Sequence, residues 1–277
     1  MTPNPSVVEI GPRPSLAGYL AEVWRARGIA LFLAWRDVIV RFKQTLIGVV
    51  WVVMRPLLVA LVFAFVFGRI AGLSSAGVPY VLFVMVAMLP WQFISAGIAQ
   101  GAESLITNSG LISKIYFPRI LLPISNLLSN FLDLLITLPI IAVLMIWYGI
   151  APSQSALIMV PFWLLIMVAM TFGLAAILSA LNALYRDVRY LVPFILLFAL
   201  YISPIGYGIE NVPVEWQPLY CLNPLAALFD ALRAELLGTP RAAPAWASYW
   251  TVVVAFGLAL CSVVLFWRAE RRIVDVI

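Results

Sequence analysis

Charged side chains within an otherwise apolar chain are the residues of this sequence most able to do chemistry. Four cations, Arg36, Arg41, Lys43 and Arg55, lie before or within the first long apolar segment, and Asp133 lies in the middle of a later one. Ionisable groups in apolar surroundings are costly, so they usually pair with one another or mark a path for ions or substrate. Cations at the depth of lipid headgroups can also bind phosphate. We therefore predict that the four cations are candidates for binding a substrate or a lipid headgroup.

Asp133 is the one acidic residue at the middle of an apolar segment, within the run Asn130-Phe131-Leu132-Asp133. Two interpretations of its carboxylate are open. It lines or gates a pore, or it is a structural partner for a hydroxyl or backbone group of a neighbouring helix. The cations also have an alternative role, because arginine and lysine side chains near a membrane surface anchor helices to ordinary anionic lipids.

Several kinds of chemistry are excluded by the residues that the sequence lacks. It has no histidine and no G-x-x-x-x-G-K-[ST] phosphate-binding loop, and its only lysines are Lys43 and Lys114. Cys221 and Cys261 form no close-spaced pair of the kind that binds metal. We therefore predict no metal site, no cofactor and no ATPase in this chain. The net charge of +5 is interpreted as a sign of membrane orientation and not of nucleic-acid binding.

The elements that position these residues are predicted to be helices in a membrane. Hydrophobic residues make up 64% of the 277 residues and charged residues only 10%, against roughly 45–50% and 25% in soluble proteins. The apolar runs are about 20 residues long, and a helix of that length satisfies its own backbone hydrogen bonds across the hydrocarbon. The predicted fold class is therefore an all-α integral membrane protein.

Six spans are predicted from these runs, at residues 49–70, 80–100, 120–147, 156–181, 191–207 and 249–267. Residues 15–46 are amphipathic but too charged to span, so they are predicted to form a helix in the membrane interface. Residues 209–248 contain five prolines, cannot cross the membrane and could hold two short helices.

Lysine and arginine are distributed unevenly along this map. Thirteen of the seventeen lie in the N-terminal segment, in the loops after the second and fourth spans, and in the C-terminal tail. By the positive-inside rule these parts face the cytoplasm. Both termini are therefore predicted to be cytoplasmic, which agrees with an even number of spans.

A set of short motifs resembles the ABC-2 type permeases that export polysaccharides. The first is the run from Trp35 to Trp51, which contains Arg36-Asp37, Arg41 and Leu46-Ile47-Gly48 and is followed by Pro56-Leu57. Phe42 stands where that family usually has tyrosine, a change that keeps the ring. Further landmarks follow in the family's order: Leu89-Pro90-Trp91, the run from Lys114 to Arg119, Tyr185-Arg186-Asp187-Val188, Ser203-Pro204-Ile205 and Asn223-Pro224.

The resemblance implies the membrane half of an ATP-driven exporter in a bacterial inner membrane. Such permeases are homodimers that bind two copies of a separate ABC ATPase, which holds the ATP and magnesium, and they move an undecaprenyl-type lipid-linked glycan. The loop after the second span would form a coupling helix at residues 102–118, and residues 209–238 would form short, re-entrant helices at the outer mouth. The residues expected to contact the ATPase are Glu103, Ser104, Asn108, Lys114, Arg186 and Asp187.

Spans one and five of each subunit would line a channel at the dimer axis. Its predicted lining is Trp51, Phe63, Trp91, Asp133, Phe194, Phe198 and Tyr201. Flat aromatic rings suit the C–H faces of sugars, although interfacial belts and helix packing use the same residues.

Two other classes of protein stay open at this stage. The first is an ABC-2 exporter of a small molecule, lipid or drug, which predicts a similar fold and a narrower pore. The second is a membrane enzyme that acts on glycans, which would need several ionisable groups converging within the membrane; Asp133 and Arg55 are the only mid-membrane charges.

Overall fold

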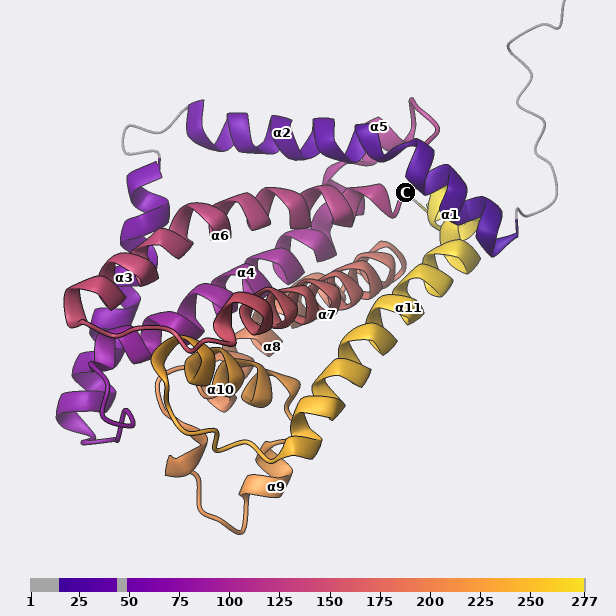
Figure 1. Cartoon of the computed structure of the whole chain (residues 1–277). Coiled ribbons are helices and arrows are strands. Elements are labelled where there is room, and N and C mark those ends of the chain that lie inside the picture. Colours follow the sequence, from indigo (N-terminus) through magenta and orange to yellow (C-terminus); the bar gives the residue numbers. More distant parts are fainter. Residues whose placement is uncertain (1–14, 44–48, 277) are drawn as a thin grey trace, which may run out of the picture.

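The computed structural model describes residues 15–43 and 49–276, and all regular secondary structure within these ranges is helical. Five of the described helices are long and apolar enough to cross a membrane. They are α3 (Val49–Phe63) with its continuation as a π-helix (Ala64–Ile70), α4 (Tyr80–Thr107), α6 (Leu121–Tyr148), α7 (Ala156–Leu184) and α11 (Ala245–Val276). Figure 1 shows α4, α6 and α7 inclined alongside one another, with α3 and α11 on opposite flanks. The predicted all-α membrane class is confirmed.

Helix α8 (Val188–Ile202) corresponds to the predicted fifth span but is shorter than residues 191–207. Its 15 residues rise about 22 Å, less than the roughly 30 Å of a hydrocarbon core. The helix ends because Ser203 adopts an extended conformation before Pro204, as residues before proline prefer. The count of six spans therefore stays a prediction.

The predicted coupling helix at residues 102–118 is divided in the structure. Residues 102–107 complete α4, α5 (Ser109–Ile112) is a single turn, and the chain from residue 113 to Pro118 is not helical. Asn108 causes the break, since its side-chain amide donates to the carbonyl of Ser104 at 2.9 Å and caps the end of α4. The prediction of one continuous helix here was wrong, because it overlooked this cap.

The predicted interface helix is also two helices, α1 (Leu16–Arg25) and α2 (Arg27–Lys43), and residues 44–46 of the prediction lie outside the described residues. Helix α2 runs alongside α6, and α1 lies beside the C-terminal end of α11 (Figure 1). Phe32, Trp35 and Ile39 are exposed on α2. An exposed apolar face on a charged helix suits the membrane interface, and that placement stays a prediction.

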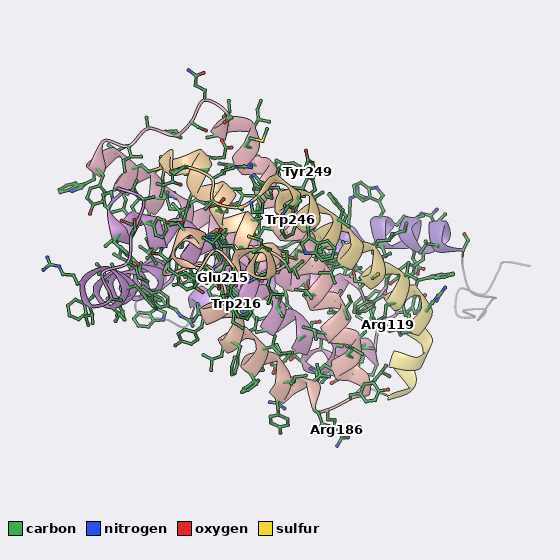
Figure 2. The ribbon with its side chains drawn as sticks, turned by 90° about the horizontal axis from the view of Figure 1, so that it is seen from below. Arg119, Arg186, Glu215, Trp216, Trp246 and Tyr249 are labelled. Atoms are coloured by element: carbon green, nitrogen blue, oxygen red, sulfur yellow. The ribbon has the colours of Figure 1, made fainter. Side chains whose placement is uncertain are left out.

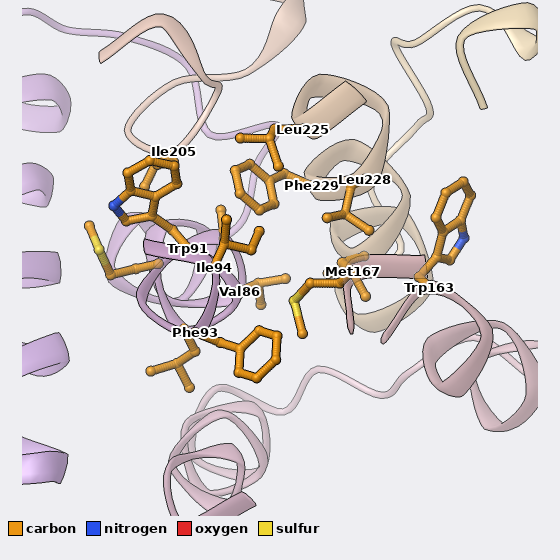
Figure 3. Packing of buried hydrophobic residues seen from close by; sticks show 14 of the residues in the cluster. Val86, Trp91, Phe93, Ile94, Trp163, Met167, Ile205, Leu225, Leu228 and Phe229 are labelled. Carbon is orange, nitrogen blue, oxygen red and sulfur yellow. The ribbon is translucent and has the colours of Figure 1, made fainter. Parts of the chain in front are cut away.

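The main hydrophobic core is centred on α4, most of whose residues are buried. Figure 3 shows Phe93 and Ile94 of α4 packed near Met167 of α7 and Phe229 of α10. Gly97 and Gly101 let α4 and α7 approach closely. A Cβ atom at Gly101 would lie 2.6 Å from that of Ala175, and one at Gly97 would lie 2.8 Å from Thr171, so the small residues are required by the packing.

Residues 209–238 contain a 3₁₀ turn (Ile209–Asn211) and the helices α9 (Gln217–Tyr220) and α10 (Pro224–Leu237). Asn223 begins α10, because its side-chain oxygen accepts a hydrogen bond from the backbone N–H of Leu225 at 3.0 Å. Helix α10 is largely buried against α4, α7 and α11. Short helices at this position agree with the sequence, whereas the burial of α10 in the bundle is a result of the tertiary structure.

Candidate functional site

A polar cavity of about 780 Å³ opens among helices α2, α3, α4, α6 and α8. Many of its lining residues are apolar, as expected between membrane helices, but charged and amide side chains gather at one part of its wall. These charged and amide residues are Arg41, Arg55, Gln92, Gln100, Asn130 and Asp133. The cavity therefore brings three ionisable groups and three amides together among the long helices.

The centre of this polar wall is an ion pair between Arg41 of α2 and Asp133 of α6. The other guanidinium nitrogen of Arg41 lies 3.4 Å from the amide oxygen of Gln100, which also accepts a hydrogen bond from Asn130 at 3.1 Å. The second oxygen of Asp133 is buried and has no hydrogen-bond partner among the described residues. The network joins three helices and leaves one carboxylate oxygen for a further donor.

Arg55 and Trp51 extend the cavity wall along α3. The guanidinium of Arg55 has no ion-pair or hydrogen-bond partner in the part of the chain that the structure describes, and Trp51 is 57% exposed. Two cations and one carboxylate leave the wall with an excess of positive charge. Such a wall can bind an anionic group, because cations in a low-dielectric site attract anions strongly.

Sequence reasoning named Arg41, Arg55, Trp51 and Asp133 separately, and the structure brings these four residues into one cavity. It pairs Asp133 with a guanidinium, a partner that neither sequence interpretation had named. Gln92, Gln100 and Asn130 were missed as site residues. Amide side chains within apolar helices were the available signal, because such groups seldom face lipid.

The other predicted headgroup-binding cations lie outside the cavity wall. Arg36 donates to Asp37 at 2.8 Å and to Asn108 at 3.3 Å, and so joins α2 to the end of α4. Lys43 is exposed at the last turn of α2. Both cations are therefore available at the surface.

The remaining predicted channel residues do not gather at the cavity. Trp91 is 5% exposed and belongs to the main core (Figure 3). Phe63 packs 5.3 Å from Phe67, measured between ring centroids. The other three, Phe194, Phe198 and Tyr201, lie on the exposed face of α8.

The predicted ATPase contacts fall into a buried and an exposed group. Ser104 is 1% exposed and shares a hydrogen bond of 2.9 Å with Ser179 of α7, so it packs two helices together and cannot touch a partner. Glu103 pairs with Arg189 at 3.6 Å on the surface. Lys114, Arg186 and Asp187 are exposed, and Figure 2 shows Arg186 at the rim of the molecule.

A further ion pair connects this end of the molecule to the last helix. The backbone N–H of Arg119 donates to the carboxylate of Glu270 at 2.9 Å, and its guanidinium lies 3.3 Å from the same oxygen. The loop before α6 is thereby attached to α11.

Long apolar helices around a charged cavity define a multi-pass membrane protein. Comparison with known families makes the class specific, because the pattern of the ABC-2 type transporter family matches residues 30–237. The chain belongs to this family, which confirms the resemblance seen in its motifs.

Three curated relatives are named as export permeases or as a transport protein. The chain is 31% identical over 198 residues to the O-antigen export system permease protein RfbA of Klebsiella pneumoniae, covering 72% of this chain and 76% of the relative. It is 28% identical over 253 residues to the protein of the same name from Myxococcus xanthus, covering 90% and 92%. It is 22% identical over 221 residues to the polysialic acid transport protein KpsM of Escherichia coli, covering 78% and 83%.

Proposed function

We propose that this chain is the permease subunit of an ATP-driven exporter that moves a lipid-linked polysaccharide from the cytoplasm across the bacterial inner membrane. The observation that carries the proposal is its similarity to relatives named as O-antigen export permeases, which extends over 90% of this chain in one case. The polar cavity agrees with it, because a transport path through a membrane needs polar groups that face away from lipid.

The proposed topology has six spans, with α8 as the fifth and both termini in the cytoplasm. The bias of lysine and arginine toward the loops on one side supports this orientation. Figure 2 shows the exposed Trp216, Trp246 and Tyr249 apart from Arg186, and exposed aromatic residues are frequent at a membrane interface. Helices α1 and α2 would lie at the cytoplasmic interface.

The proposed assembly is a homodimer with two copies of a separate ATPase, which binds ATP and magnesium. The exposed faces of α3 and α8, with Trp51, Phe194, Phe198 and Tyr201, would line the path between the two permeases. The ATPase would dock on Glu103, Lys114, Arg186 and Asp187. Closure of the ATPase would move α4 and α7, whose ends adjoin this surface.

Substrate entry is proposed to begin at the cations. Arg36 and Lys43 are exposed on α2 and would attract the phosphates of an undecaprenyl-type carrier. Arg41 and Arg55 would then bind that anionic group at the cavity wall, while weak aromatic contacts let the sugar units slide. The unsatisfied oxygen of Asp133 would accept a hydrogen bond from a sugar hydroxyl.

Co-purification tests this proposal first. The tagged permease is purified in detergent together with its ABC ATPase, and ATP hydrolysis is measured with and without lipid-linked glycan. We expect a stable complex of two permeases and two ATPases whose hydrolysis rate changes when the glycan is added. A rate that responds to small amphiphilic drugs and not to the glycan would favour the small-molecule exporter, and the absence of any associated ATPase would contradict both.

A further inference from the structure

The segment from residue 203 to residue 208, which follows α8, has no regular secondary structure. Its sequence is Ser203-Pro204-Ile205-Gly206-Tyr207-Gly208, and no helix includes it. Most of the segment is buried. Because carbonyl groups that a helix leaves unpaired must find donors when water is excluded, the partners of this segment determine how firmly the outer end of α8 is held.

Arg233 of α10 supplies two of those donors. Its guanidinium donates to the carbonyls of Ile205 at 2.8 Å and Tyr207 at 3.2 Å, and its Nε donates to the carbonyl of Phe83 in α4 at 3.1 Å. The guanidinium also lies 3.7 Å from the centre of the Phe83 ring. The side chain is only 3% exposed. A single fork of donors therefore ties α10, α4 and the end of α8 together.

Two further contacts hold the same segment. The hydroxyl of Tyr80 in α4 donates to the carbonyl of Gly206. Asn223, which begins α10, donates to the hydroxyl of Ser203 at 3.1 Å. Together with the two carbonyls that Arg233 binds, these contacts attach four residues of the segment to α4 and α10.

Gly206 shows how closely the segment packs on its other side. A Cβ atom at this position would lie 2.7 Å from the ring of Phe63 and 2.8 Å from that of Phe67. The segment therefore fills the space between α10 and the helix that begins at α3, and it has no room to shift unless its hydrogen bonds break.

The charge of Arg233 is held by carbonyl dipoles and not by a hydrogen-bonded carboxylate. The neighbouring Asp230 instead accepts hydrogen bonds from the backbone N–H groups of Ala242 at 3.3 Å and Ala243 at 3.0 Å. Burial lowers the pKa of Arg233 to about 10, so the side chain remains a cation at neutral pH. A neutral residue of similar size would leave three buried carbonyls without these donors.

We propose that Arg233 is a positioning residue that keeps the outer mouth closed at rest by joining the end of α8 to α4 and α10. Opening of the mouth then requires the hydrogen bonds of Arg233 to the segment after α8 to break, so these bonds stabilise the closed state. The inference rests on the proposed function for the claim that α8 lines the path. It adds a role for Arg233, which none of the sequence motifs had singled out.

The test measures how readily the outer end of α8 is reached from outside the cell. Tyr201, in the last turn of α8, is replaced by cysteine in a Cys261→Ser background, and Cys221 is retained because it is fully buried. Cells that express this permease with a variant of its ATPase that cannot hydrolyse ATP are treated with a membrane-impermeant maleimide. With Arg233→Met we expect labelling of the new cysteine to become about tenfold faster in the absence of ATP turnover, because the closed state loses its fork of donors.

Three further variants make the outcome specific. Arg233→Lys keeps the charge but cannot bridge three carbonyls, and Tyr80→Phe removes one hydroxyl without a cavity, so both are expected to give smaller increases in labelling. Arg241→Met is the control, because Arg241 is an exposed arginine at the same end that pairs with Glu235. It is expected to label at the parental rate.

If Arg233→Met does not fold, as judged by size-exclusion chromatography, the labelling rates of Arg233→Lys and Tyr80→Phe test the proposal instead. Parental labelling in both would overturn the proposal, and so would an equal increase with Arg241→Met. The labelling rate requires neither glycan nor substrate-stimulated hydrolysis. A failure of the proposed role for Arg233 is therefore distinguishable from a failure of the proposed exporter function, which co-purification tests.

Discussion

Gly173→Leu is expected to remove most of the folded protein from detergent extracts. Gly173 of α7 faces the backbone of α11, and a Cβ atom there would lie 2.5 Å from the carbonyl carbon of Leu258 and 2.7 Å from the nitrogen of Ala259. A clash with backbone cannot be relieved by a change of rotamer. Overpacking of this kind costs about 1–3 kcal/mol and sometimes more, and here it separates two helices that pack along much of their length.

Fluorescence-detected size-exclusion chromatography after stepwise heating would measure this loss. The matched control is Gly257→Leu, because Gly257 lies in α11 and a Cβ atom added there would have no neighbouring atom within 4 Å among the described residues. That variant is expected to keep the elution profile and melting temperature of the parent. Equal melting temperatures for both leucine variants would contradict the close contact between α7 and α11.

Reversal of one charge in the cavity is expected to have the second large effect. Arg41→Asp would place two carboxylates together on α2 and α6, and Asp133→Arg would gather three cations at the cavity wall. Like charges in a partly buried site are strongly unfavourable. Each single variant should therefore lower both the melting temperature and glycan export, whereas the double variant should regain the melting temperature, because it restores an ion pair.

Glycan export by the double variant, Arg41→Asp with Asp133→Arg, shows whether Arg41 serves only in the ion pair or also binds the substrate. If Arg41 binds an anionic group, moving the cation to α6 restores stability and leaves export low. Alanine variants in a double-mutant cycle should give a coupling energy of about 1 kcal/mol or more, within the range for residues in one network. Asp37→Ala is the control for the melting temperature, since the exposed ion pair of Asp37 with Arg36 contributes little to stability. A coupling energy near zero would show that Arg41 and Asp133 do not interact.

The long helices were predictable because local properties decide them. Each apolar run in lipid must satisfy its own backbone, so hydropathy alone locates α3, α4, α6, α7 and α11. The ends were less predictable. A side-chain cap from Asn108 breaks the expected coupling helix, and the extended residue before Pro204 shortens α8.

Motifs separated by few residues were also readable. Gly97 and Gly101 face one way on a helix, and they do contact α7. The amphipathic pattern of residues 15–46 indicated helix, although it did not reveal the break at Ala26 between α1 and α2.

Contacts between distant parts of the chain were decided by the tertiary structure alone. Arg41 meets Asp133 from 92 residues away, and Arg233 meets Phe83 from 150 residues away. Trp91 appeared suited to a channel, but α4 turns it into the core. The reason is physical: hydropathy specifies that a helix enters lipid, whereas the packing of its small and large side chains against other helices sets its rotation, and rotation determines which polar groups meet.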